Sequence, residues 1–202
     1  MSKGVLYVVS APSGCGKGTI LETVLRKNKN IYYSVSATTR SPRDGEIDNV
    51  NYYFHSKEEF EKLLNENGML EHAVYCDNFY GTPRKQVEEK LEMGYDVILE
   101  IETKGAMQVK DSYPDAVFIF ILPPSMKELR RRLEKRRTES EEIINKRLAE
   151  AVKEIKCADN YDFIMINDKL EQSILNFEAI IKATKLFTAR NLNKIDEVLE
   201  NA

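Results

Sequence analysis

The chain has 202 residues, of which 42% are hydrophobic and 31% are charged, a balance typical of a folded globular protein rather than a disordered one. This length supports one sizeable hydrophobic core and predicts a single domain with small inserted lobes. A net charge of −3 argues against non-specific binding to nucleic acid, and the longest apolar runs are far too short to span a bilayer.

Cysteine usage agrees with a reducing compartment. The three cysteines are far apart, and with only two histidines no zinc-binding spacing arises. The first residues run directly into a strand pattern and show no signal peptide. We therefore expect a cytoplasmic protein with free thiols and no membrane or nucleic-acid partner, as a monomer or a homo-oligomer.

The first predicted element is a buried strand over Val5–Val9, which ends in a glycine-rich segment. After that segment Ile20, Leu21, Val24 and Leu25 recur at helical spacing. The segment follows the P-loop pattern Gly-x-x-x-x-Gly-Lys-Ser/Thr with Ala11 for the first glycine and Gly18 for the hydroxyl residue. The order of strand, loop, lysine and helix favours nucleotide binding over the alternative, a plain glycine-rich turn.

Neither Ala11 nor Gly18 removes the features by which such a loop binds phosphate. Gly14 and Gly16 let successive N–H groups turn inward, and the helix that follows adds its positive end. Lys17 can place a compact charge at the β- and γ-phosphates. We assign ATP binding to Ala11, Pro12, Ser13, Gly14, Cys15, Gly16, Lys17, Gly18 and Thr19. A variable packing position is the expected role of Cys15, and a reactive thiolate at the helix N-terminus is the alternative.

The later elements alternate between strands and helices. Apolar runs predict buried strands at Val97–Ile101, Val117–Leu122 and Phe163–Ile166, and strands of this kind favour a parallel sheet covered on both faces. The polar stretch Ser34–Gly81 predicts an inserted lobe with its own small sheet. Within it a helix should begin at Ser56, with Glu59 completing a capping box.

The second half of the chain is more helical. Charged residues at helical spacing dominate Met126–Ala151, and Ser125 with Glu128 predicts another capping box. The region from Lys169 to Leu199 is also helical in pattern and should pack on the sheet.

Several motifs then follow in order with plausible spacing. They are Ser34–Glu46 (SVSATTRSPRDGE), Asn51–Phe54, Met69–Ala73, Asn78–Thr82, Leu99–Ala106, Pro123–Ser125, Asn145–Leu148 and Ile166–Asp168. Together they closely resemble the signatures of guanylate kinases over nearly the whole chain. The resemblance implies the P-loop NTPase fold, an α/β fold with helices on both faces of a parallel sheet. It also implies a core over 1–33, 90–125 and 152–202, a GMP-binding lobe over 34–89 and a helical lid over 126–151.

The resemblance implies that a cationic clamp holds the phosphate of GMP. The residues matching that clamp are Arg40 and Arg43, with hydroxyls from Tyr52 and Tyr80. Arginine suits the task because its planar fork meets two phosphate oxygens at once. Taken alone, the two arginines could equally be a solvated surface pair.

Guanine recognition is implied at Glu71, with Ser36 and Thr82 completing the edge. A carboxylate is acceptor-only and can take both N–H donors of guanine, whereas adenine would leave it unpaired. A solvent-facing charge is the alternative reading of Glu71 alone. Glu102 is also implied in the GMP site, although the family usually has Asp there.

Arginines crowd one charged segment, at Arg130, Arg131, Arg132, Arg136 and Arg137. Such runs are usually solvated helix faces. Arg132 and Arg136 are four residues apart and share a face, which Arg147 would join if the helix continued through Thr138–Ser140. The resemblance assigns these three to the lid and core arginines that hold the ATP phosphates.

The implied reaction is reversible transfer of the γ-phosphoryl group of ATP to GMP, and to dGMP because nothing reads the 2′-hydroxyl, in purine nucleotide metabolism and GMP recycling. Catalysis would rest on Lys17, Arg40, Arg132, Arg136 and Arg147, with Mg²⁺ bound as Mg-ATP. Since Gly18 removes the usual hydroxyl ligand, no direct metal ligand is assigned, and Thr19 and Glu100 are candidates through water. Two alternatives stay open: a kinase for another mononucleotide or a sugar phosphate, and a non-catalytic phosphopeptide-binding domain.

Overall fold

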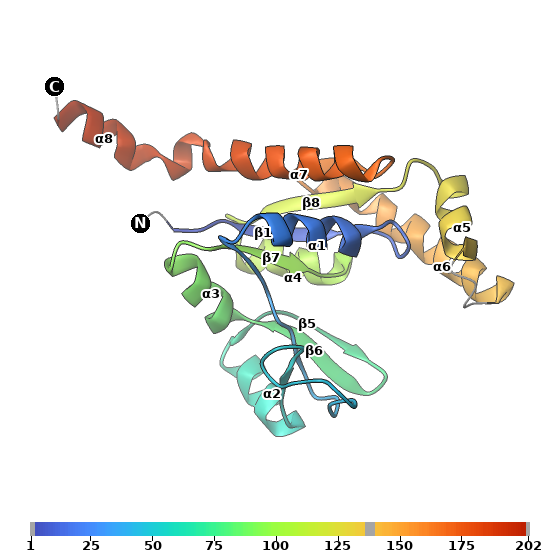
Figure 1. Cartoon of the computed structure of the whole chain (residues 1–202). Coiled ribbons are helices and arrows are strands. Elements are labelled where there is room, and N and C mark those ends of the chain that lie inside the picture. The colour runs from blue at the N-terminus through green and yellow to red at the C-terminus, as the bar shows by residue number, and fades with distance from the viewer. Residues whose placement is uncertain (1–2, 136–139, 201–202) are drawn as a thin grey trace.

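The computed structural model describes residues 3–135 and 140–200. At its centre is a five-stranded, all-parallel sheet in the order β2-β7-β1-β8-β9 (Figure 1). The strands are β1 (Leu6–Ser10), β2 (Ile31–Tyr33), β7 (Asp96–Glu100), β8 (Val117–Leu122) and β9 (Phe163–Ile166). The four strands predicted from apolar runs are confirmed to within one residue.

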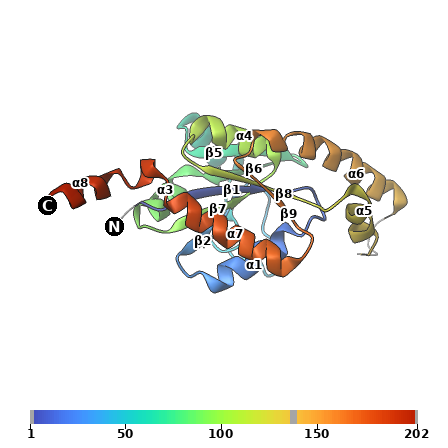
Figure 2. The same ribbon diagram turned by 90° about the horizontal axis from the view of Figure 1, so that it is seen from above.

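Both faces of the three central strands are buried, and successive side chains of each strand point to opposite sides. Tyr7 and Val9 face α1 (Lys17–Lys27) and α7 (Leu170–Lys185). Leu6 and Val8 face α3 (Arg84–Glu92) and α4 (Thr103–Ser112) on the other side. Figure 2 shows α1 and α7 along one side of the sheet and α4 along the other. The continuous apolar runs of β1, β7 and β8 follow from this double burial. On the edge strand β9, Ile164 and Ile166 are each 56% exposed, so the expectation of a buried strand there is wrong for one of its faces.

A second, four-stranded sheet forms the lobe inserted between β2 and α3, in the order β4-β3-β6-β5. Its elements are β3 (Ala37–Thr38), β4 (Tyr53–Phe54), α2 (Lys57–Asn65), β5 (Met69–Tyr75) and β6 (Asn78–Pro83). The predicted capping box is confirmed, since Ser56 and Glu59 bond reciprocally at the start of α2. Cys76 and Asp77 connect β5 to β6 with φ values of 47° and 60°, the left-handed pair that a tight hairpin turn requires.

Two helices, α5 (Met126–Lys135) and α6 (Glu141–Lys156), follow β8. Ser140 caps α6 by accepting from the Ile143 N–H, so the charged region is two helices rather than one. The capping box expected at Ser125 is only half correct. Ser125 Oγ accepts from the Glu128 N–H at 3.1 Å, but the Glu128 carboxylate binds Arg131 and Arg132 instead. The expected lid boundary at residue 151 falls inside α6.

The two C-terminal helices differ in how they pack on the core. After β9, helix α7 packs on the sheet through Ile174, Phe177 and Ile181, as expected. Helix α8 (Leu192–Glu200) has no buried residue and extends away from the sheet (Figures 1 and 2), so the expectation that the chain packs on the sheet as far as Leu199 is wrong. Two short 3₁₀ turns complete the fold, at Ala158–Asn160 and Thr188–Arg190. Within the described residues, no helix combines the length and the apolar character needed to cross a membrane.

Candidate active site

The glycine-rich loop connects the end of β1 to the start of α1. Gly14 and Gly16 have φ values of 88° and 92°, which L side chains rarely adopt. Space is also limited, since a Cβ at Gly16 would lie 2.6 Å from Asn167 Nδ2. Both glycines are therefore required by the backbone turn that precedes the helix. At Gly18, by contrast, a Cβ would meet nothing within 4 Å.

Cys15 is a packing residue of this loop. Its Sγ is buried and donates to the Ile121 carbonyl at 3.4 Å. Burial raises the pKa of the Cys15 thiol to about 12, despite the opposing charges of Arg132 and Lys17. The thiol therefore stays protonated near neutral pH, which contradicts the alternative of a reactive thiolate. The Cys15 carbonyl accepts from Asn167 Nδ2 at 2.7 Å, which ties the loop to the end of β9.

Lys17 begins α1 and lies largely out of water, with 17% of its side chain exposed. Burial lowers its pKa, and the carboxylates of Glu100, Glu154 and Glu102 oppose that shift. The Lys17 Nζ is 3.7 Å from Glu100 Oε1. The other Glu100 oxygen accepts from the Tyr33 hydroxyl at 2.9 Å. Sequence reasoning missed Tyr33, because only the sheet brings the end of β2 beside β7.

A cavity of about 450 Å³ lies between the core sheet and the lobe. The sequence-predicted residues that line it are Lys17, Ser36, Tyr52, Glu71, Tyr80, Glu100 and Glu102. Segments more than eighty residues apart in the chain therefore meet at one site. Tyr75, Lys104 and Gly105 also line the cavity and were not predicted as site residues.

Glu71 on β5 is a buried carboxylate, 8% exposed. Its Oε1 accepts from Thr82 Oγ1 of the neighbouring strand β6 at 2.7 Å. Burial is the main cause that raises the pKa of Glu71, and the charge of Glu102 adds to it. The N-terminal turn of α4 approaches closely, because a Cβ at Gly105 would lie 2.8 Å from Glu71 Oε2. A buried carboxylate that accepts from Thr82 thus faces a cavity, which excludes the solvent-facing reading of Glu71.

The two arginines predicted to clamp the GMP phosphate differ in how their side chains pack. Arg40 Nη2 forms an ion pair with Glu46 at 2.9 Å, and its guanidinium lies 5.4 Å from the ring centroid of Tyr52. Only Arg40 is therefore packed against the cavity wall. Arg43 has an exposed side chain, and its backbone N–H donates to Glu46 at 2.8 Å. Neither arginine lines the cavity directly, and Tyr80 stands edge-on to Tyr52 with 6.2 Å between centroids.

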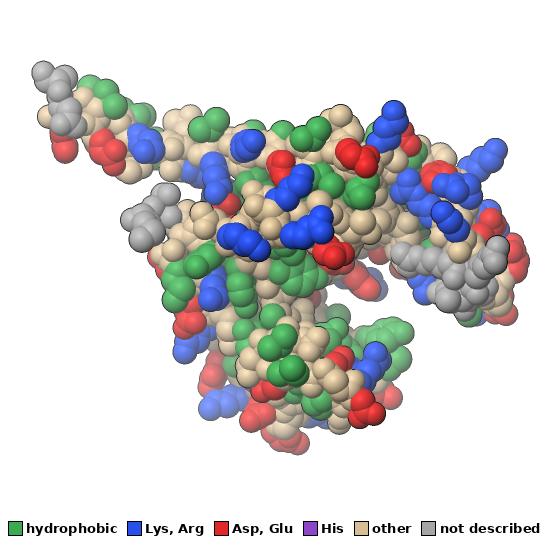
Figure 3. All heavy atoms as spheres, viewed as in Figure 1, with side chains coloured by type: hydrophobic (Ala, Val, Ile, Leu, Met, Phe, Trp, Pro, Cys, Tyr) green, Lys and Arg blue, Asp and Glu red, His purple; other side chains and the backbone are tan. Residues whose placement is uncertain are grey.

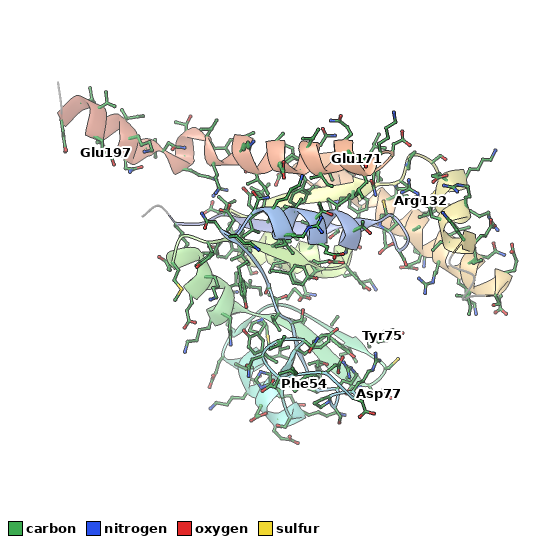
Figure 4. All side chains as sticks on the ribbon, in the orientation of Figure 1. Phe54, Tyr75, Asp77, Arg132, Glu171 and Glu197 are labelled. Carbon is green, nitrogen blue, oxygen red and sulfur yellow. The ribbon has the colours of Figure 1, made fainter. Side chains whose placement is uncertain are left out.

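The other predicted arginines reach the phosphate loop from α5 and α6. Arg132 donates to the Cys15 carbonyl at 3.2 Å and to the Asn167 carbonyl at 3.0 Å. Arg147 donates to Ser13 Oγ at 2.8 Å. They converge from two helices, not along one continuous helix face, and Arg136 lies outside the described residues. Figure 4 labels Arg132 across the open side of the molecule from Tyr75 and Asp77, and Figure 3 shows the hollow between these two parts.

The residues near Lys17 fit a magnesium ion held mostly through water. No group of three or more histidine, cysteine or acidic side chains gathers as a metal site in the described part of the chain. Glu100 and Glu102 supply carboxylate oxygens beside the lysine, and the Thr19 side chain is exposed. Magnesium typically keeps several waters and binds one or two carboxylates together with substrate phosphates, which suits this donor set.

Comparison with known proteins shows the family of this chain. The family model described as guanylate kinase matches residues 3–184. A curated guanylate kinase of Carboxydothermus hydrogenoformans is 53% identical over 92% of this chain and 91% of its own length. That of Oceanobacillus iheyensis is 46% identical over 98% and 97%. The crystal structure of guanylate kinase from Anaplasma phagocytophilum superposes with a TM-score of 0.72, at 36% identity over 94% of this chain and 90% of that one.

Proposed function

Because the chain belongs to the guanylate kinase family, we propose that it transfers the γ-phosphoryl group of ATP to GMP and dGMP, giving ADP and the corresponding diphosphate. The observation that carries the choice of acceptor is Glu71, a buried carboxylate facing a cavity of nucleotide size. A buried acceptor left without donors is costly, and guanine offers two N–H groups on one edge.

ATP binds at the phosphate loop. The backbone N–H groups around Gly14 and Gly16 and the start of α1 receive the phosphates. Lys17, Arg132 and Arg147 add positive charge there, and the family resemblance adds Arg136 to this set. In the free protein Arg132 is held on the loop carbonyl of Cys15 and Arg147 on the Ser13 hydroxyl. Both are therefore near the phosphates before ATP arrives.

GMP binds in the cavity between core and lobe. Glu71 accepts from the guanine edge, with Thr82 holding its other oxygen and Ser36 completing the contact. Arg40, Arg43, Tyr52 and Tyr80 hold the phosphate, and Glu102 lies on the core side of the site. Glu46 prepares Arg40 for this role, since its carboxylate fixes the guanidinium against the Tyr52 ring.

The reaction needs no strong general base, because the attacking phosphate oxygen is already ionised near neutral pH. What the chain's residues do is align two polyanions and neutralise their charge. Mg²⁺ bound with ATP supplies further neutralisation, with Glu100 and Thr19 placed to hold its water shell. Approach of the lid (126–151) to the lobe (34–89) over the core (1–33, 90–125, 152–202) would exclude water from the transfer. We place the reaction in the cytoplasm, in purine nucleotide metabolism and GMP recycling.

The test is ADP production from Mg-ATP with GMP, dGMP, AMP, CMP, UMP, dTMP and a ribose bisphosphate in parallel. We expect fast turnover with GMP and dGMP and little with the others. Preference for another acceptor would overturn the roles of Glu71, Ser36 and Thr82. Absence of turnover with every acceptor would support a phosphopeptide-binding module instead.

A further inference from the structure

A second cavity lies at the amino-terminal ends of the core strands, whereas the phosphate loop lies at their carboxyl-terminal ends. It has a volume of about 430 Å³ and is formed where β1 and β7 begin, under the chain that leads from α7 into α8. A strand of five residues spans about 15 Å, so the strand β1 separates this cavity from the loop. None of the residues assigned to ATP or GMP lines it.

Basic side chains outnumber acidic ones in this cavity: Lys3, Lys185, Arg190 and Lys194 against Asp96 and Glu197. Some of these charges already have partners. Lys185 Nζ lies 2.6 Å from Asp96 Oδ2, and the other oxygen of this buried carboxylate accepts from the Val5 N–H at 3.1 Å. Lys3 is paired with Glu92 at 2.8 Å.

Two cations of the cavity, Arg190 and Lys194, have no carboxylate partner in the described part of the chain. Arg190 donates from Nη2 to the Asp115 carbonyl at 2.9 Å, while its Nε is buried and has no hydrogen-bond partner. Neither Arg190 nor Lys194 forms an ion pair with any described residue. Glu197 also lines the cavity, where its carboxylate accepts from Asn193 Nδ2 at 3.0 Å. An arginine and a lysine that form no ion pair with any described residue thus line one cavity.

We propose that this cavity binds a small phosphorylated anion through Arg190 and Lys194, at a site separate from the catalytic one. Arginine meets phosphate oxygens with two parallel N–H groups, and lysine adds a point charge. The volume suits a ligand no larger than a mononucleotide. The pairing of Lys185 with Asp96 fixes the floor of the cavity, so that the ligand meets the two unpaired cations.

The test uses the full-length protein with its active site blocked by one equivalent of a bisubstrate nucleotide, in which adenosine and guanosine are joined through five phosphates and which is too large for a cavity of mononucleotide size. Pyrophosphate is titrated calorimetrically, with inorganic phosphate and CMP as parallel arms that separate inorganic from nucleotide sources. Hydrogen exchange of residues 186–200 locates the binding. We expect one further site, at which Lys194→Gln weakens binding by about tenfold or more, the cost of one charge-assisted hydrogen bond. Arg190→Gln should weaken it further.

Lys182→Gln, which removes an exposed cation of α7 outside the cavity, is the matched control and should bind like the unchanged protein. Lys194 lies on the exposed helix α8, so its substitution leaves the fold intact. Binding of none of the three anions to the blocked enzyme would overturn the proposal. So would affinities that are equal in all variants, or exchange protection confined to the phosphate loop.

Discussion

The Glu71 carboxylate lowers the stability of the free folded protein, because the fold holds its charge away from water. Its pKa is raised above the usual 4.5, so the folded state binds the proton more tightly than the unfolded state does. The cost is absent below about pH 4.5, where both states are protonated, and it grows as the pH rises through the folded pKa. In the proposed complex, GMP offsets that cost by donating hydrogen bonds to the carboxylate.

Glu71→Gln should therefore raise the melting temperature of the free protein at pH 8, and the gain should shrink as the pH approaches 4.5. The same change should lower the preference for GMP over AMP by at least about tenfold, since an amide cannot accept both guanine donors. Calorimetry from pH 5 to 8 and kcat/KM for the two acceptors measure these effects. Glu22→Gln, an exposed carboxylate on α1, should change neither. Unaltered selectivity would contradict the guanine assignment.

Lys17→Ala should lower kcat by roughly 10²- to 10³-fold, the usual loss when one preorganised contact to the transition-state charge is removed. Single-turnover rates with saturating ATP and GMP measure the chemical step. Lys29→Ala, which removes an exposed lysine beyond α1, is the control and should keep the normal rate. A near-normal rate for Lys17→Ala would refute its role.

Tyr33 is a positioning residue rather than a catalytic one, because it acts on Lys17 through Glu100. Tyr33→Phe frees the Glu100 carboxylate to compete with ATP phosphates for the lysine. We expect KM for ATP to rise by about three- to tenfold, the value of a typical hydrogen bond, because the change reaches the lysine only through Glu100; the effect on kcat should be smaller. Steady-state kinetics separate the two. Tyr95→Phe, at a partly exposed ring outside the cavity, should have normal constants, and a fall in kcat alone would contradict a positioning role.

At the scale of elements, the close approach of α4 to β5 shapes the guanine end of the cavity. Gly105→Ala places a methyl group 2.8 Å from Glu71 Oε2, a contact shorter than side-chain Cβ atoms tolerate. The carboxylate must move, and a displaced binding group typically costs tenfold or more, so we expect KM for GMP to rise roughly tenfold. The KM for ATP is the internal control. An unchanged KM for GMP would mean that the carboxylate relaxes without loss.

The elements that carry strong local signals were predictable, and those set by packing were not. Uniformly apolar strands and the Ser56–Glu59 cap are visible in the sequence because their causes are local. The partner of the Glu128 carboxylate could not be predicted from the sequence, because it could complete the helix cap or bind Arg131 and Arg132. It binds the arginines, since two charged donors stabilise it more than one backbone N–H does. Helix α8 has the periodicity of a packed helix, yet nothing described covers its apolar side.

The residues of the site can likewise be divided into those predictable from local sequence and those that local sequence does not reveal. The phosphate loop follows from glycine stereochemistry, whereas Glu71 with Thr82 came from family resemblance, since a lone glutamate carries no local signal. Neither a local sequence pattern nor the family resemblance indicated Tyr33. It pairs in register with Ile98, which places it two residues from Glu100 along the adjacent strand. That neighbourhood exists only once β2 and β7 are joined in a parallel sheet.

At the scale of the whole molecule, the two substrates are received by parts that stand apart in the free protein (Figure 3). Arg132 and Arg147 hold to the phosphate loop, and Arg40 holds to Glu46 on the lobe. Phosphoryl transfer needs these groups around one phosphate, so α5 and α6 must approach the lobe. The radius of gyration from solution X-ray scattering should fall when ADP and GMP are both added, and fall less with either alone. An unchanged radius would contradict closure.

The hairpin turn between β5 and β6 offers a way to watch that motion. Cys76 stands exposed at its tip, while Cys15 is buried with a raised pKa and Cys157 is half-buried. A maleimide fluorophore should therefore attach to Cys76 first, without any cysteine being added or removed. The dye would sit at the rim of the hollow across from Arg132, where its emission reports the approach of the lid in real time.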